Sequence, residues 1–436
     1  MKELLKENAS MKEMIDGLWL LPRDIVSEGY DVALLALSEQ IPMTIHEYQT
    51  GTECFTWIIP EKWTCHEAYL ETIDGNRLFS YSDNPLHVVS YSLPFEGIVT
   101  REELLKHLYS HPKLPDAIPF QFKYYDKDWG LCCSQQLKDS LTDDKYKVTI
   151  KTTFEAGNLK VGEVVIPGGS DESIVICAHL CHPAQVNDDL TGVVVGLEVM
   201  RNLLQQPNLR YTYRFLMVPE TIGSVAYLSH NEALIPKMKG GLFLESMGRE
   251  FPFALQSSFD ATSEIDLCFS QAVKESGPDN WTAPFWGVIC NDERQFNAPG
   301  IRVPMLSLSR VLHRSHSDGP YREYHSSDDI PDLVSHQSLE ESKDLVLKMI
   351  DTLENNWLPV NKFKGEIFCS RYGIQFDFAR DFSNSMSLFN IMFQLDGEKS
   401  LVEIAEICNT PFDTVKKTVD EFHKHNLVEL RPCSNV

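Results

Sequence analysis

Basic residues are scarce in this sequence: 39 Lys and Arg stand against 63 Asp and Glu, which gives a formal charge of −24. Because such a chain is repelled by phosphates and anionic lipids, neither nucleic acid nor a membrane surface is expected as a partner of the whole protein. No apolar run approaches the length of a membrane span. The N-terminal segment MKELLKENASMKEMIDGLWLL lacks the apolar core and cleavage site of a signal peptide. We therefore expect a cytoplasmic protein.

The sequence also lacks cysteines at the spacing of a disulfide framework or a zinc knuckle. Its eleven cysteines are scattered, with Cys132 and Cys133 adjacent and no CxxC pair. This pattern is typical of reduced thiols in a cytosolic protein. With 436 residues, of which 43% are hydrophobic and 23% charged, the chain has the composition of a globular protein of two or three domains.

One stretch, Ser173 to Gly192 (SIVICAHLCHPAQVNDDLTG), gathers chemically active side chains between a strand and a helix. Residues 174–178 form an apolar, branched run that predicts a buried strand, and Thr191-Gly192 open a helix with an apolar face. Between them lie imidazole, thiol and carboxylate groups: His179, Cys181, His182, Asp188 and Asp189. Because open α/β sheets bind ligands at the carboxyl ends of their strands, this stretch predicts a site.

Imidazole nitrogens and carboxylate oxygens are the ligands that zinc takes in open catalytic sites. The alternative is a capped helix start, in which Asp188 or Asp189 accepts hydrogen bonds from backbone amides and the histidines are incidental. Further acidic and histidine motifs follow downstream, and they favour the metal.

The secondary-structure pattern of the sequence changes three times along the chain. Residues 1–50 are predicted to be helical and to end in a strand, and strands alternate with helices in residues 163–357. Such alternation predicts an α/β sheet with helices on both faces. Between them, residues 51–162 contain short runs such as 88–92 separated by turn residues, which predicts an inserted β-rich domain. This inserted domain could gate substrate access, bind carbohydrate or have only a structural role.

Residues 359–436 are predicted to form a winged helix-turn-helix domain. A helical segment at 401–408 precedes a second helix with Thr410 as its N-cap, and residues 427–430 read as a wing strand. The segment carries nine Lys or Arg against eleven Asp or Glu and so lacks the basic footprint of a DNA reader. We expect a protein-docking module, with DNA binding as the alternative.

Five ordered motifs, HLCHPAQVNDDLTG, VPETIGS, FLESMG, NDERQF and YHSSDD, resemble those of the co-catalytic zinc aminopeptidases of the MH clan. More closely, they resemble a bacterial family of "aminopeptidase-like" proteins with an inserted β domain and a C-terminal winged helix. The resemblance covers nearly the whole chain. It implies a phosphorylase/hydrolase-like aminopeptidase sandwich, which is a mixed sheet with helices on both faces.

The resemblance also implies a set of metal ligands. His179 matches the first zinc histidine, Asp188 the carboxylate that bridges two metals, and His325 the closing histidine. Glu245 stands where the family has an aspartate ligand.

Two departures from the family pattern affect this ligand set. Thr221 replaces a metal-binding glutamate, and Cys181 replaces the aspartate that orients the first histidine. His182 could supply the missing ligand. We therefore expect one tightly bound zinc, held by Asp188, His325 and one or both of His179 and His182; a second zinc at Glu245 stays open.

For catalysis, the resemblance assigns Glu220 of VPETIGS as the general base, which would take a proton from water and pass it to the leaving amine. A carboxylate at a helix N-terminus, stabilised by the helix dipole, is the alternative. Arg294 could clamp a substrate carboxylate or stabilise an oxyanion, or it could pair with Asp292 or Glu293. Tyr324 could hydrogen-bond the reaction intermediate or be a buried structural residue.

Further carboxylates are predicted to support the ligands or to contact substrate. Asp189 follows the bridging position, and Asp292 and Glu293 could bind a substrate ammonium. Asp328 and Asp329 follow His325 and could orient its imidazole, or could cap the next turn.

Three functions compete at this stage. The first is a zinc-dependent hydrolase acting on an amide bond of a small peptide or acylated amine. The second is a non-catalytic regulator that senses a metabolite and signals through the winged helix. The third, implied by the family's association with surface-glycan pathways, is an amidohydrolase acting on an amino sugar. In each case the protein could also form a homo-oligomer.

Overall fold

The computed structural model describes residues 4–375 and 382–433. The chain divides into two compact units, Met1–Phe259 with Ala283–Lys343 and Asp260–Thr282 with Asp344–Val436. In the described ranges, no helix combines the length and the apolar character needed to cross a membrane.

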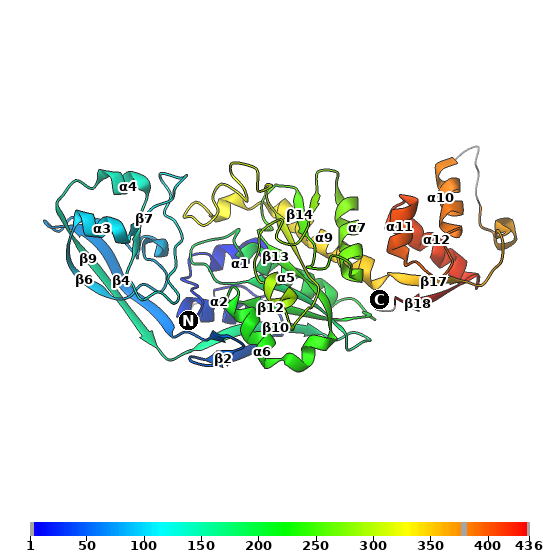
Figure 1. Ribbon diagram of the computed structural model, residues 1–436, viewed down its shortest axis with the longest axis horizontal. Helices are drawn as coiled ribbons and strands as arrows, with labels where there is room; N and C mark the ends of the chain where they lie inside the picture. The colour runs from blue at the N-terminus through cyan, green and yellow to red at the C-terminus, as the bar shows by residue number, and fades with distance from the viewer. Residues whose placement is uncertain (1–3, 376–381, 434–436) are drawn as a thin grey trace. The chain divides into compact units, whose positions relative to one another are not determined.

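A mixed, eight-stranded sheet forms the core of the first unit, in the order β1-β10-β12-β11-β13-β16-β14-β15 (Figure 1). Its strands are β1 (Thr44–Gln49), β10 (Asn158–Ile166), β11 (Ser173–His179), β12 (Thr212–Val218), β13 (Met238–Glu245), β14 (Phe253–Gln256), β15 (Trp281–Ala283) and β16 (Met305–Arg310). The central strands β12, β11, β13 and β16 are parallel, and β1, β10 and β14 pair antiparallel. All seven residues of β11 are buried, as the continuous apolar run of a central parallel strand requires.

Helices pack against this sheet, as the alternating pattern predicted. They are α1 (Met11–Leu18), α2 (Glu28–Ser38), α5 (Leu190–Leu203), α6 (Ile222–His230) and α8 (Glu293–Asn297), with the 3₁₀ turns η2 (Glu232–Lys237) and η3 (Pro331–Leu333). Helix α5 lies against β11, β12 and β13, and α6 lies against β10 and β12. The predicted mixed α/β sheet packed with helices is therefore present.

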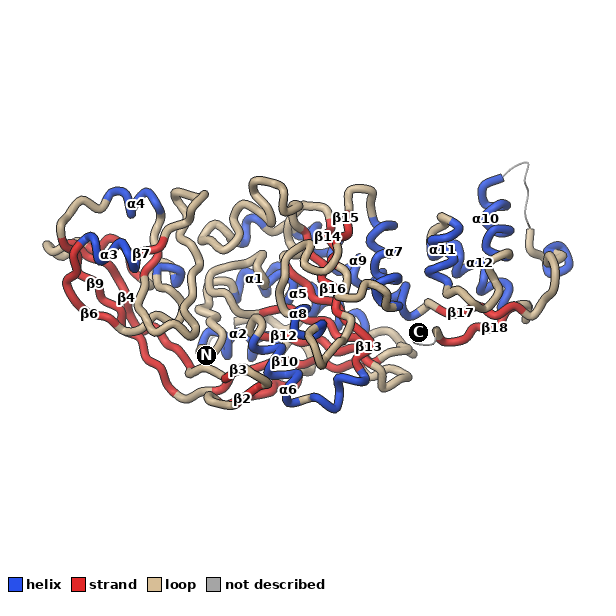
Figure 2. Tube along the Cα trace, in the orientation of Figure 1, coloured by secondary structure: helices blue, strands red, loops and turns tan. Residues whose placement is uncertain are grey.

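A separate four-stranded antiparallel sheet, β5-β4-β9-β6, occupies most of the region predicted to be β-rich (Figure 2). Its elements are β4 (Lys62–Thr72), β5 (Arg77–Ser80), β6 (Phe95–Thr100) and β9 (Lys145–Glu155), joined by the short strands β2 (Glu53–Cys54), β3 (Trp57–Ile58), β7 (Leu108–Tyr109) and β8 (Leu131–Cys132), the helices α3 (Arg101–His107) and α4 (Gln135–Ser140), and the turn η1 (Pro85–His87). Strand β10 begins at Asn158, inside the predicted range 51–162, yet all of it belongs to the large sheet.

One local prediction in this region is not met. Residues 88–92 form two isolated bridges rather than a strand, because Tyr91 has a left-handed φ of 64° that interrupts the extended backbone. Thr100 is the N-cap of α3 and accepts from the Glu103 amide, while the Glu103 carboxylate binds Lys106 and His107.

The second unit contains the helices expected near the C-terminus. Its elements are α7 (Glu264–Ser276), α9 (His336–Glu354), which begins in the first unit, β17 (Trp357–Asn361), η4 (Cys369–Tyr372), α10 (Phe382–Met392), α11 (Leu401–Cys408), α12 (Phe412–Lys424) and β18 (Val428–Pro432). The predicted N-cap of α12 was wrong by one residue: Pro411 holds that position. Thr410 instead closes α11, since its amide donates to Ala405 and its hydroxyl to Cys408.

Candidate metal centre

Several predicted site residues lie where parallel strands of the large sheet end. His179 is the last residue of β11 and Glu245 the last of β13. Glu220 follows the end of β12 by two residues. Because these neighbouring strands run in the same direction, their carboxyl ends meet at one edge of the sheet, where such folds place their sites.

Three imidazoles surround the carboxylate of Asp188. The Asp188 Oδ1 atom lies 3.1 Å from His179 Nε2 and 3.4 Å from His182 Nδ1. Its Oδ2 atom lies 3.0 Å from Nε2 of His325, which arrives from the loop after β16. Asp188, His179 and His182 are buried, while 31% of the His325 side chain is exposed. The structure thus brings together ligands from distant parts of the chain.

These side chains form two ligand triads that share Asp188. One consists of His182, Asp188 and His325, and the other of His179, Asp188 and Glu245. Within each triad the potential ligand atoms all lie within 4.8 Å of one another. Both histidines of the HLCH motif are therefore placed as potential ligands, one in each triad. Asp188 Oδ1 lies near one histidine of each triad and Oδ2 lies near His325, so this carboxylate reaches both triads and is suited to bridge two cations.

The hydrogen-bonding state of these atoms fits a metal. Among the described residues, the converging ligand atoms make no well-aligned hydrogen bond, although the imidazole nitrogens lie 3.0–3.4 Å from the Asp188 oxygens. These atoms are His179 Nε2, His182 Nδ1, both oxygens of Asp188, both oxygens of Glu245 and His325 Nε2. Buried polar atoms are rarely left unpaired, and a bound ion is one of the standard reasons for such a cluster. Nitrogen and oxygen donors at this spacing suit zinc.

The charges of the site agree with cation binding. Burial and the neighbouring Asp188 raise the pKa of Glu245 well above its usual value. Burial opposes ionisation of Asp188 too, but His182, His179 and His325 hold its pKa well below the usual range. Asp188 in turn raises the pKa of His179 and His182 against the effect of burial. A divalent cation satisfies the same carboxylates by displacing protons from the imidazoles.

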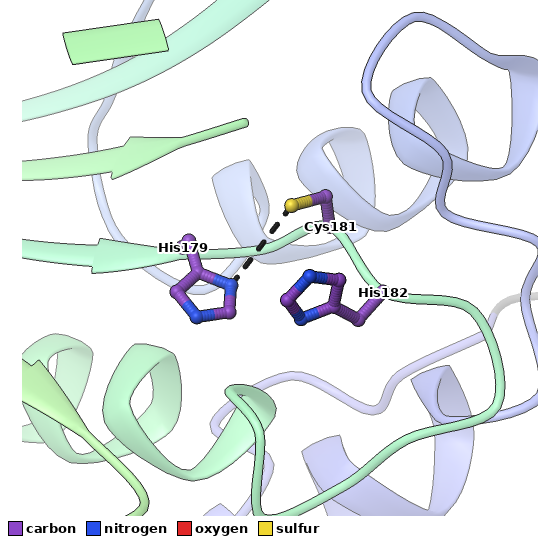
Figure 3. Close-up of side chains that lie close together, drawn as sticks. All are labelled: His179, Cys181 and His182. Carbon is purple, nitrogen blue, oxygen red and sulfur yellow. Dashed lines mark hydrogen bonds between the residues drawn. The ribbon is translucent and has the colours of Figure 1, made fainter. Parts of the chain in front are cut away.

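Cys181 connects a ligand to the predicted base. Its Sγ atom lies 3.9 Å from His179 Nδ1 (Figure 3). The same sulfur accepts a hydrogen bond from the Glu220 amide at 3.2 Å. The opposite nitrogen of the His179 ring faces Asp188. His182 is arranged similarly: Nδ1 faces Asp188 and Nε2 lies 3.2 Å from Glu220 Oε2. Each imidazole is thus oriented through the nitrogen that points away from Asp188.

Arg294 bonds to two neighbouring segments, and its predicted role toward a substrate stays a prediction. Its guanidinium donates to the Asn291 carbonyl at 2.8 Å and to the Thr221 hydroxyl at 3.3 Å. Asp292 accepts from the Thr221 amide and from Ser224 at the start of α6.

Glu293 is equally occupied, since it accepts from the Asn291 amide and from Gln256. Burial raises the pKa of Asp292 to about 6 and that of Glu293 to about 7. Both carboxylates are fully buried in this arrangement.

The two aspartates of the NDDLTG motif have separate roles. Asp189 is the N-cap of α5, and its Oδ1 atom accepts from the amides of Gly192 at 2.9 Å and Ser246 at 3.0 Å. A Cβ at position 192 would lie 2.5 Å from an Asp189 oxygen and 2.6 Å from the Leu244 carbonyl, so only glycine fits. Asp189 is therefore the residue that caps the start of the helix, whereas Asp188 faces the histidines.

Residues around His325 also differ from the prediction. Asp329 accepts from the amides of Asn187 and Asp188, at 2.9 and 3.1 Å, so it holds the loop of Asp188 rather than the His325 ring. Asp328 is exposed. Tyr324 stacks on His325, with ring centroids 4.0 Å apart, and burial raises the pKa of its phenol.

Two contacts of the site were missed at the sequence level. Arg23 is fully buried and donates to the carbonyls of Leu180, His182 and Gln185, at 2.9, 2.7 and 3.0 Å. It therefore fixes the loop that carries His182. Phe120, from the β-rich region, contacts the His182 ring with centroids 4.7 Å apart. For the Arg23 contact, the available sequence signal was an arginine inside an apolar stretch. For the Phe120 contact, the sequence contained no signal.

Comparison with known proteins places the chain in a family. Residues 12–356 match the family described as "Domain of unknown function (DUF4910)". A Clostridium acetobutylicum protein named "Putative polysaccharide biosynthesis protein with aminopeptidase-like domain" is 32% identical over 424 residues, which cover 96% of this chain and 95% of that protein.

Solved structures show the same fold. The crystal structure of a "putative peptidase" from Clostridium acetobutylicum matches with a TM-score of 0.87 and 31% identity, over 96% of each chain. BSAP, a zinc aminopeptidase from Bacillus subtilis, matches with a TM-score of 0.58 and 14% identity, over 80% of this chain and 95% of BSAP. These matches confirm the resemblance to the zinc aminopeptidase superfamily. The chain belongs to the family described as domain of unknown function DUF4910 and has an aminopeptidase-like fold.

Proposed function

We propose that this protein is a zinc-dependent hydrolase that cleaves an amide bond in a small peptide or acylated amine. The observation that carries the proposal is the pair of ligand triads sharing Asp188, one through His182 and His325 and one through His179 and Glu245. The aminopeptidase-like fold and the peptidase relatives support a hydrolase of this kind.

The ligand set accounts for the departure from the family pattern. Thr221 offers a hydroxyl to Arg294 instead of a carboxylate to the site. His182 Nδ1 lies 3.4 Å from Asp188 and belongs to the triad with His325, where the replaced glutamate would have contributed. We therefore assign His182 as the substitute ligand, and two cations as the full complement.

Zinc, if held by Asp188, Glu245 and the three histidines, would polarise an amide carbonyl and would lower the pKa of a bound water from about 15.7 to about 7. Glu220 lies beside His182 with 26% of its side chain exposed, a position that suits a base. Burial opposes its ionisation, but a cationic His182 lowers the pKa of Glu220 to about 2, which makes the carboxylate a weak base; a neutral His182 bound to zinc would remove this effect.

The reaction follows from these placements. Water attacks the amide carbon, and Glu220 takes the water proton and passes it to the nitrogen as the C–N bond breaks. The products are a carboxylic acid and an amine, so atoms and charge balance. The phenol of Tyr324, whose ring stacks on His325, is the hydroxyl donor that we propose for the tetrahedral intermediate.

A second candidate is the same hydrolysis applied to an amide-bearing sugar of polysaccharide biosynthesis. It is favoured by one observation: the relative that is 32% identical over 96% of this chain carries "polysaccharide biosynthesis" in its name. The two candidates share the metal centre and differ only in substrate.

A chelator experiment tests the proposal. The purified protein is assayed on amino-acid amides and N-acylated amino sugars before chelation, after dialysis against a chelator, and after zinc is restored. Activity that disappears on chelation and returns with zinc supports the proposal. Activity unaffected by removal of zinc contradicts it, and zinc binding without turnover of any substrate favours the non-catalytic regulator.

A further inference from the structure

A segment of the β-rich region is bonded directly to the loop that carries His325. The Phe120 amide donates to the His325 carbonyl at 2.9 Å, and the Ser327 amide donates to the Ile118 carbonyl at 2.8 Å. Between these bonds, Pro119 and Ser326 form an antiparallel bridge. Residues 118–120 therefore form a short strand-like segment beside the metal centre.

The rings of Phe120, Phe122 and Tyr124 form a row that continues from this segment. Phe120 meets the rings of His182 and His325 edge to face, at 4.7 and 5.5 Å between centroids. Phe122 contacts Phe120 at 5.7 Å and stacks on Tyr124 at 4.6 Å with an angle of 16° between planes. Only two ring contacts thus separate Phe122 from a potential metal ligand.

Burial changes sharply along the row. Phe120 is 3% exposed, whereas Phe122 is 48% exposed. The row therefore runs from the proposed catalytic groups to an exposed ring.

An exposed phenylalanine is common on protein surfaces and by itself indicates nothing. Phe122 differs because stacking on Tyr124 and contact with Phe120 fix its ring before any ligand arrives. A fixed ring binds a second ring without a large loss of conformational freedom. Rings prefer offset or edge contacts at 4.5–7 Å, the spacing already found within this row.

We propose that Phe122, backed by Phe120, is a substrate-binding platform for a six-membered ring attached next to the scissile amide. The ring is the apolar face of a pyranose or an aromatic side chain, and both present the same flat apolar surface. The platform gives the β-rich region a part in substrate selection. This inference rests on the proposed function, because it places the ring relative to the amide that the metal centre would cleave.

The test compares Phe122→Ala with the native protein on three amides: L-alaninamide, which has no ring, L-phenylalaninamide and N-acetylglucosamine. We expect kcat/KM to fall about tenfold for at least one ring substrate, while L-alaninamide changes less than twofold and zinc content is unchanged. The ring substrate whose kcat/KM falls identifies the kind of ring that Phe122 binds. Phe55→Ala, which removes another exposed ring (46%), serves as control and should change none.

A binding measurement keeps the platform separate from catalysis. Calorimetry with L-phenylalanine, N-acetylglucosamine and L-alanine should show a ring ligand bound more tightly than L-alanine, and Phe122→Ala should abolish that preference. If the native protein hydrolyses nothing but retains the preference, the proposed function fails and the platform stands. Equal losses on all three amides, no loss on any, or no preference for a ring ligand would overturn the platform.

Discussion

The Nε2 atom of His325 lies 3.0 Å from Oδ2 of Asp188, the contact that joins the last motif of the chain to the first. His325 reaches this position with a left-handed φ of 55°, on a loop bonded through its own carbonyl to Phe120. Asp188 is held from the other side by Asp329. One carboxylate is therefore positioned from two directions to serve two ligand triads.

Sharing of Asp188 predicts the zinc content of variants. The native protein should bind two zinc ions per chain, and Asp188→Ala should bind none, because both triads lose their common ligand. His325→Ala and Glu245→Gln should each retain about one, since each affects a single triad. Elemental analysis of gel-filtered protein measures this, with exposed Asp328→Asn as a control that keeps both ions. Full zinc occupancy in Asp188→Ala would refute the shared ligand.

Glu220→Gln separates the base from the ligands. The amide side chain can keep a contact with His182 but cannot accept a proton, so kcat should fall about 10²- to 10⁴-fold with zinc content unchanged. Kinetics and elemental analysis on the same preparation measure both. If zinc is lost to the extent seen in His182→Ala, Glu220 acts mainly by orienting His182, and another group must serve as base.

Much of this centre could be predicted from sequence because its positions follow from local rules. A buried apolar run ending in His179, and another ending in Glu245, are strands whose direction the alternating pattern makes parallel, so their ends had to share an edge.

The remaining features depend on contacts between segments that carry no local signal. Arg23 precedes the metal loop by more than 150 positions and binds it only through backbone carbonyls, which leave no trace in sequence. Phe120 reaches His325 by backbone pairing that depends on how the β-rich region packs. Asp329 was expected at His325 because the two are close in sequence, but it accepts from the amides of Asn187 and Asp188.

Cys181 should influence zinc affinity without being a required ligand. Its sulfur contacts His179 Nδ1 and accepts from the Glu220 amide, so Cys181→Ala should loosen the His179 ring and weaken zinc binding about 10- to 100-fold. Cys181→Asp, which restores a hydrogen-bond acceptor, should recover affinity. Competition with a chelator measures the zinc Kd.

Cys177→Ala is the matched control, because Cys177 is also buried in β11 but contacts Ser224 instead of a ligand. It should change stability and leave zinc affinity within twofold. Equal effects of the two alanine variants on zinc affinity would mean that Cys181 only fills space.

A carboxylate away from the metal centre should make stability depend on pH. Glu163 in β10 is buried and binds Arg214 at 2.7 Å, His46 at 2.8 Å and Tyr227 at 2.6 Å. Burial opposes its ionisation, but these partners lower the pKa of Glu163 to about 2. Removing one partner of a buried pair leaves the other charge uncompensated, so Glu163→Gln should cost about 3–5 kcal/mol of unfolding free energy at pH 7.

The sign of the pH effect follows from the lowered pKa. The contribution of ionised Glu163 is complete above the ordinary carboxyl value of 4.5 and is lost as pH falls toward 2. The difference between native protein and Glu163→Gln should therefore be constant from pH 7 to about 5 and shrink below that, as denaturant unfolding at several pH values would show. Glu47→Gln, whose carboxylate is 49% exposed near Lys160, should change stability by less than about 1 kcal/mol. A difference that stays constant down to pH 3 would mean that Glu163 contributes through shape rather than charge.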